Sequence, residues 1–200
     1  NVQLRLTRLQ EVEANSKQTE ALHRYLTEQF MPFLETAEFW ADNECNRLGM
    51  TLKTVLPVNE RTLSPSDFGF HNAIRTNNGL VFLDFEHFGW DDPAKTMSDF
   101  VLHPAMDLPK DLKQRFVSRA VSAMGESGTL AERLPVVYPL FGLKWCMIFL
   151  NEFLKEGLER RQFAAGTSLE ADALQAGQLV KSKYMLQQID GEYEHFPYNV

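Results

Sequence analysis

Ser64-Pro65-Ser66-Asp67-Phe68-Gly69-Phe70-His71-Asn72 is the stretch that decides how this chain is interpreted, and Asp67 and Asn72 are its informative side chains. Phosphoryl transfer needs a carboxylate that accepts or orients the proton of the attacking hydroxyl, and oxygen ligands that hold magnesium against the phosphates. In Asp-x-x-x-x-Asn the carboxylate can face the acceptor while the amide oxygen, one tight turn later, faces the metal. This spacing indicates Asp67 as a catalytic carboxylate and Asn72 as a metal ligand.

The segment that follows predicts a β-hairpin. Two short apolar runs flank Asn78-Gly79, and Asn-Gly between such runs is among the strongest short-range hairpin signals. Because Asn72 enters the hairpin and Asp84 leaves it, both oxygen ligands are expected at its open end. Asp84 ends the apolar run Leu80–Leu83, and a carboxylate beside a core is costly unless it has a partner, which a metal ion would supply.

The block Leu63–Phe100 resembles the catalytic core of the aminoglycoside phosphotransferase and choline kinase-like family. The family pattern runs His-x-Asp-x-x-x-x-Asn, then a strand ending in Ile-Asp-Phe/Trp-Glu, then Gly-x-x-Asp-Pro-Ala and an acidic helix. This chain has the matching residues in order: Asp67 and Asn72, then Leu83-Asp84-Phe85-Glu86, then Gly89-Trp90-Asp91-Asp92-Pro93-Ala94 with Ser98-Asp99-Phe100. It departs from the family at Pro65, where the family has a histidine that braces the loop. That difference concerns loop geometry and catalytic competence more than fold.

The resemblance implies an ATP-dependent phosphotransferase that acts on an alcohol group. ATP or GTP would be the phosphate donor, Mg²⁺ the metal cofactor, and a sugar, aminoglycoside or amino alcohol the hydroxyl acceptor. Asp67 would be catalytic, Asn72 and Asp84 would bind the metal and through it the nucleotide, and Glu86 would be a further residue of the metal site. Nothing before Asp67 resembles the glycine-rich loop and strand lysine of the family's nucleotide-binding lobe. We therefore expect that N-terminal lobe to lie upstream as a partner of this chain, and the isolated chain to be inactive.

The predicted fold class is α+β, mainly α: a protein kinase-like C-terminal lobe with a small hairpin at the active site. We expect one domain over residues 1–200, with a helical segment at 1–50, the catalytic loop, hairpin and metal motif at 51–105, and a helical bundle at 106–200. Within these ranges the apolar spacing predicts the following features: a helix through Leu22–Trp40 that Pro32 kinks or divides, a helix from Pro109 that Gly125 and Gly128 end, a buried central helix over Leu134–Leu154, a last helix from Ser168 onward, and an aromatic tail of Tyr193, Phe196 and Tyr198 that folds back on it.

Composition limits the other possibilities. The chain is 44% hydrophobic and has a formal net charge of −7, which disfavours a nucleic-acid or anionic-membrane surface. Its cysteines, Cys45 and Cys146, have no metal-binding spacing, so free buried thiols in a reducing compartment are expected. No uninterrupted apolar run reaches the length of a membrane span. We expect a cytoplasmic protein with no nucleic-acid or membrane partner.

Other interpretations of the same residues stay open. His71 and His87 flank the predicted site without metal-ligand spacing, so solvent exposure or hydrogen bonding is favoured for them. The acidic residues near Pro93 are expected to cap a helix and brace the loop: Asp91, Asp92 and Asp99. The chain could also be a catalytically silent binding or regulatory module that kept the fold. A metal-dependent hydrolase using Asp67 and Asp84 is less favoured, because the usual additional His and carboxylate ligands are missing.

Overall fold

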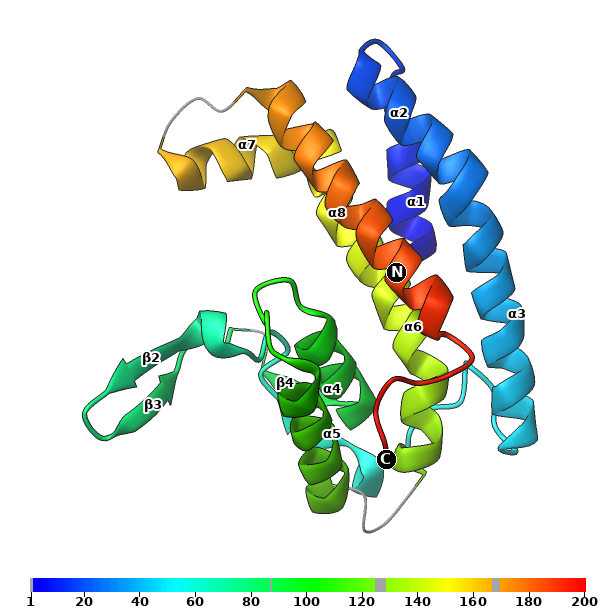
Figure 1. Ribbon diagram of the computed structural model, residues 1–200, viewed down its shortest axis with the longest axis vertical. Helices are drawn as coiled ribbons and strands as arrows, with labels where there is room; N and C mark the ends of the chain where they lie inside the picture. The colour runs from blue at the N-terminus through cyan, green and yellow to red at the C-terminus, as the bar shows by residue number, and fades with distance from the viewer. Residues whose placement is uncertain (1, 87, 125–128, 167–169) are drawn as a thin grey trace. The chain divides into compact units, whose positions relative to one another are not determined.

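The computed structural model describes residues 2–86, 88–124, 129–166 and 170–200, and shows a mainly helical α+β protein with two small antiparallel sheets (Figure 1). This confirms the predicted class at that level. The elements, in chain order, are α1 (Val2–Gln10), α2 (Lys17–Tyr25), α3 (Met31–Arg47), β1 (Thr62–Ser64), β2 (Ala73–Thr76), β3 (Gly79–Phe82), β4 (Gly89–Asp91), α4 (Pro93–Leu102), α5 (Lys110–Met124), α6 (Leu130–Phe149), α7 (Lys155–Ala165) and α8 (Ala171–Glu192).

The chain forms two compact units. The first comprises the described residues of 1–39 and 142–191, and the second comprises those of 40–141 and 192–200. The predicted catalytic loop, hairpin and metal motif all belong to the second unit. Helices α3, α6 and α8 each contribute residues to both units.

The helical segment around Pro32 continues through the proline. A proline inside an α-helix lacks an N–H, and its ring clashes with the carbonyl four residues earlier. Here a π-helical stretch, Leu26–Phe30, precedes it, and the Met31 N–H donates to the Leu26 carbonyl. The wider turn accommodates the ring, so the predicted break becomes a local change of helix type.

Helix α6 is the predicted central helix. Tyr138, Leu143, Cys146 and Met147 are fully buried along it. By length and composition, Leu130–Phe153 could cross a membrane, but 61% of its most apolar window is buried, as in the core helix of a soluble protein. Cys146 and Cys45 are both buried free thiols, as expected.

In the first unit, a buried polar network joins three helices. The Tyr25 hydroxyl lies 2.9 Å from the Ser182 Oγ, and Ser182 donates to the Cys146 carbonyl at 3.0 Å. These bonds satisfy hydroxyl groups that would otherwise be buried without partners. They fix α2, α6 and α8 together.

Two of the C-terminal aromatic residues pack on α3 and α6. Phe196 meets Tyr138 of α6 with a centroid distance of 5.1 Å, and Tyr193 meets Trp40 of α3 at 5.6 Å. The last helix, α8, begins at Ala171 and α5 ends at Met124. The predicted boundary residues of those two helices lie outside the described part of the chain: Gly125, Gly128 and Ser168.

The predicted hairpin is present and projects from the rest of its unit (Figure 1). Thr76 pairs with Gly79, so its loop is Asn77-Asn78 and Gly79 already belongs to β3. Gly79 has φ +121°, a conformation that residues with a side chain rarely adopt. The Thr76 hydroxyl accepts from the Asn78 N–H and donates to the Gly79 carbonyl, which closes the turn.

Candidate active site

The loop that carries Asp67 is fixed at its base by β1. This strand pairs with β4, so that Ser64 lies opposite Gly89. The buried Ser64 hydroxyl lies 2.8 Å from the Thr96 hydroxyl of α4 and accepts from the Ser66 N–H. The Asp67 N–H donates to the Pro65 carbonyl at 2.8 Å. A tight turn therefore presents Asp67 directly after the strand.

Asp67 and Asn72 are brought together as their spacing predicts. A 3₁₀ turn at Phe70–Asn72 returns the chain, and the Asn72 side-chain amide donates to the Asp67 carbonyl at 3.0 Å and to its Oδ2 at 3.2 Å. Both donations come from the amide nitrogen, so the Asn72 side-chain oxygen faces away from Asp67 and can serve as a ligand.

The hairpin returns the chain to Asn72. The Leu83 N–H donates to the Asn72 carbonyl at 2.8 Å, one step beyond the Ala73–Phe82 pair. Asp84 follows immediately with φ +60°, in the left-handed region. Asn72 and Asp84 therefore lie at the same open end of the hairpin, as the sequence predicts.

The sequence argument that Asp84 ends a buried strand, and therefore needs a metal ion as its partner, is wrong. Leu80, Val81 and Leu83 are 45–50% exposed, so Asp84 does not end a buried strand. Asp84 and Glu86 are themselves exposed. In the described part of the chain, Asp84 forms no hydrogen bond or ion pair, which leaves its carboxylate available to a cation.

Two histidines contact Asp67, and the sequence points to only one of them. His71 Nε2 lies 3.0 Å from Asp67 Oδ1, and His103 Nε2 lies 3.8 Å from the same oxygen. The two imidazole rings stack with centroids 4.0 Å apart and an interplanar angle of 3°. The hydrogen-bonding role favoured for His71 is therefore present. His103 lies 36 residues beyond Asp67, and nothing in the sequence marks it.

The protonation of His103 follows from its surroundings. Its Nδ1 accepts from the Ala105 N–H at 3.0 Å, so a neutral ring carries its proton on Nε2, which faces Asp67. Burial, and to a smaller extent the neighbouring His71, lower the pKa of His103 to about 4, while Asp67 opposes the shift. His103 is therefore neutral at neutral pH.

The ligand atoms of Asp67, His71 and His103 lie within 4.8 Å of one another, close enough to suggest a metal site. Each imidazole nitrogen binds a metal along its lone pair, in the plane of its ring. One ion cannot lie in the planes of two parallel stacked rings at once. In addition, the Nε2 atom of His103, which would have to bind the metal, carries the proton. As arranged, the cluster suits hydrogen bonding to the carboxylate.

Magnesium prefers oxygen ligands, which the open end of the hairpin supplies. The donor set of Asn72 and Asp84, one amide oxygen and one carboxylate without a protein partner among the described residues, fits such an ion.

The acidic residues near Pro93 brace α4, as predicted. Asp92 is the N-cap, and its Oδ1 accepts from the Ala94 N–H at 2.8 Å. Its other oxygen pairs with Arg133, whose side chain is 7% exposed. Asp91 pairs with Lys95 at 2.8 Å, and Lys95 also lies 3.9 Å from Asp99. His87 lies outside the described residues.

No family model matches the sequence, and no curated protein or solved structure shows significant similarity to it.

Proposed function

We propose that this chain is the catalytic lobe of a small-molecule kinase, which transfers the γ-phosphate of ATP or GTP to a hydroxyl group. The observation that carries the proposal is the arrangement of the loop and hairpin: the Asn72 side chain contacts Asp67, and the Asn72 backbone contacts Leu83, next to Asp84. Three residues with the required chemistry thereby come from two segments to one end of a hairpin. Their order and spacing match the family pattern.

In this proposal Asp67 orients the acceptor hydroxyl and accepts its proton. Its Oδ1 is held by His71 and its Oδ2 by Asn72, which fixes the plane of the carboxylate. Each oxygen keeps a lone pair for the acceptor. Asn72 and Asp84 would hold magnesium, with Glu86 as a further residue of that site, and the ion would neutralise charge on the nucleotide phosphates.

His71 and His103 could replace the bracing histidine that the family has where this chain has Pro65. The family braces its catalytic carboxylate loop through a histidine at that position, and this chain has a proline there. His71 and His103 contact the same carboxylate from later in the chain. This support favours a catalytically competent loop over the silent module.

An exposed apolar surface fits the expected partner lobe. Large apolar side chains around the hairpin and β4 are 45–66% exposed: Ile74, Leu80, Val81, Leu83, Phe85, Phe88 and Trp90. Large exposed apolar side chains gathered on one hairpin and the strand after it suit an interaction surface. We place the nucleotide-binding lobe of the same protein against it.

The acceptor class can be narrowed within this proposal. Phe70, in the catalytic loop, lines an apolar groove of about 490 Å³, formed with α4 and α5, where Arg115 and Arg119 are the charged residues. A cationic acceptor in that groove would face two guanidinium groups. A neutral sugar therefore suits it better than an aminoglycoside.

The catalytically silent module is the second candidate. It is favoured by Pro65 and by the position of Asp84 on an exposed hairpin whose apolar strands have no core beneath them. Such a module would bind a partner through that surface without phosphoryl transfer.

The experiment that separates the two candidates uses the protein joined to its nucleotide-binding lobe. Phosphate transfer from ATP and from GTP is measured against neutral sugars, aminoglycosides and amino alcohols, for the parent, Asp67→Asn and the surface control Asp111→Asn. We expect transfer that Asp111→Asn retains and Asp67→Asn loses by at least about a hundredfold. No transfer by the parent would support the silent module, and equal transfer by all three proteins would contradict the catalytic role of Asp67.

A further inference from the structure

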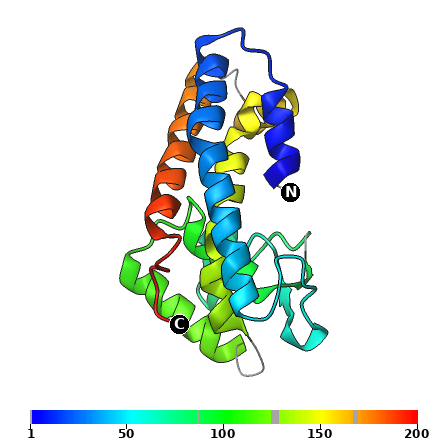
Figure 2. The ribbon, with the colours of Figure 1, turned by 90° about the vertical axis from the view of Figure 1, so that its right-hand side faces the viewer.

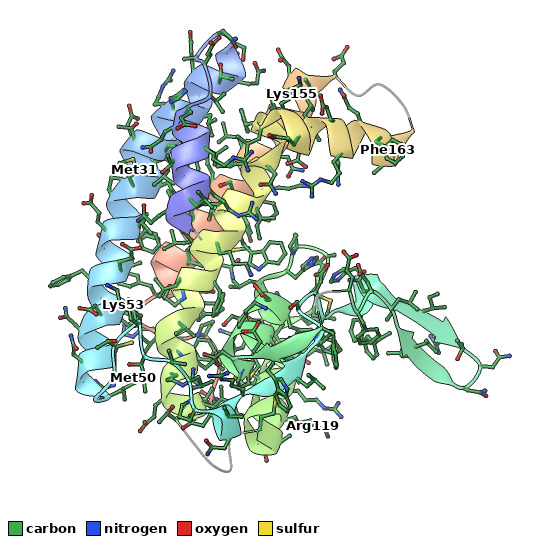
Figure 3. The ribbon with its side chains drawn as sticks, turned by 180° about the vertical axis from the view of Figure 1, so that it is seen from behind. Met31, Met50, Lys53, Arg119, Lys155 and Phe163 are labelled. Atoms are coloured by element: carbon green, nitrogen blue, oxygen red, sulfur yellow. The ribbon has the colours of Figure 1, made fainter. Side chains whose placement is uncertain are left out.

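A second, chemically distinct cavity lies in the first unit, between α1 and the start of α7. Its volume is about 340 Å³. Figure 2 shows α1 beside this part of the chain, and Figure 3 labels Lys155, the first residue of α7. The lining residues come from three segments: Leu4, Arg5, Arg8, Asn151, Leu154, Glu156, Gly157 and Arg160.

Three guanidinium groups line this cavity against one carboxylate. Arg8 pairs with Glu156 at 3.1 Å, and Arg5 donates to the neutral side chain of Asn151 at 2.7 Å. Arg160 forms no ion pair with any described residue. The local charge is therefore positive although the whole chain carries a net charge of −7. Burial lowers the pKa of Arg5, and the charges of Arg8 and Arg160 lower it further.

The backbone at the cavity is closely packed. Leu154 is the N-cap of α7 and has no side-chain acceptor for the N–H groups of the first turn. A Cβ added at Gly157 would lie 2.0 Å from the Asn151 carbonyl oxygen, so the first turn lies directly against Asn151. Asn151 in turn positions Arg5.

We propose that this cavity binds a small organic phosphate. Guanidinium groups pair with phosphate oxygens in bidentate geometry, and each of the three arginines comes from an ordered helix. Inorganic phosphate alone would leave much of the volume empty, and Leu4 and Leu154 supply an apolar wall for an organic substituent. The inference does not depend on the kinase proposal, because the residues of the two sites belong to different units.

The test measures the affinity of the chain for phenyl phosphate in 150 mM KCl with EDTA, by calorimetry, with phenol as the uncharged probe. We expect phenyl phosphate to bind with a millimolar or lower dissociation constant and phenol to bind at least about tenfold more weakly. Arg160→Gln should lower the affinity for phenyl phosphate about tenfold. Arg161→Gln changes the next residue of α7, which does not line the cavity, and should leave the affinity unchanged. Glu156→Gln should strengthen binding several-fold, because it removes the competing carboxylate.

Arg5→Gln would test the same cavity, but it also loses the hydrogen bond to Asn151 and could fail to fold. Arg160→Gln changes an exposed residue, so the test relies on that variant. Equal effects of Arg160→Gln and Arg161→Gln would overturn the proposal, as would equal affinity for phenol and phenyl phosphate. Absence of phenyl phosphate binding together with binding of heparin would make the arginines a general polyanion surface, which also contradicts it.

Discussion

His71 holds the carboxylate of Asp67 through its Nε2, 3.0 Å from Oδ1, while its ring stacks on His103. Gln can place an N–H near the position of Nε2, whereas Asn reaches only the position of Nδ1. His71→Asn should therefore lower the free energy of unfolding by about 0.5–1 kcal/mol, and His71→Gln by less. Urea denaturation of the three proteins checks this order. Equal losses in both variants would mean that the ring stack, and not the bond to Asp67, provides the stability.

His103 predicts a pH dependence of stability. Its folded pKa of about 4 lies below the ordinary value of 6.5, so between these values the unfolded state binds more protons. The contribution of neutral His103 to the free energy of unfolding is present above about pH 6.5 and is lost as the pH falls toward 4. His103→Asn keeps an acceptor for the Ala105 N–H and removes the titrating group. The variant should lose less unfolding free energy than the parent across this window, and the exposed His195→Asn should behave like the parent.

Asp92 both caps α4 and neutralises Arg133. Asp92→Ala removes the cap and leaves a buried guanidinium without its carboxylate, so we expect the free energy of unfolding to fall by about 2–4 kcal/mol. Asp92→Asn keeps the capping oxygen and should lose less. Thermal unfolding followed by circular dichroism measures both. A loss below about 1 kcal/mol in the alanine variant would contradict this account of the pair.

Gly157 is required by the close approach of α7 to Asn151. A Cβ there would lie 2.0 Å from a backbone oxygen, whereas one at Gly177 of α8 would meet no atom within 4 Å. Gly157→Ala should destabilise the protein by at least about 1–3 kcal/mol, because the backbone has to shift. Gly177→Ala should be neutral or stabilise it by up to about 1 kcal/mol. Denaturation midpoints that do not differ between the two variants would contradict the packing at Asn151.

Local signals in the sequence account for the features that were predicted correctly. Asn78-Gly79 between apolar runs gives the hairpin, and Asp92-Pro93 gives the start of α4, because turn and cap preferences act over a few residues. The bond between Asp67 and Asn72 likewise follows from a spacing of five residues.

The features that were missed depend on contacts between distant segments. Strands β1 and β4 have three residues each and pair across 24 intervening residues, so no local pattern marks them. His103 reaches Asp67 only through the packing of α4. The exposure of Leu80 and Leu83 was missed because an apolar run has the same sequence whether its strand lies against a core or projects from it.

The central claim is that Asp67 and Asp84 have different roles at one site, and magnesium-nucleotide affinity tests it most directly. The measurement is calorimetric titration of Mg–ATP and Mg–GTP into the chain joined to the nucleotide-binding lobe that the proposal expects upstream, with Asp67→Asn, Asp84→Asn and Asp111→Asn as variants. The isolated chain is expected to bind weakly and turn over little, because in the proposed kinase the phosphate-binding groups needed for positioning would be on the other lobe. Asp84→Asn should weaken binding by at least about tenfold, while Asp67→Asn and Asp111→Asn bind like the parent. A parent that binds no magnesium-nucleotide at millimolar concentration, or an Asp84→Asn variant that binds as tightly as Asp111→Asn, would contradict the account.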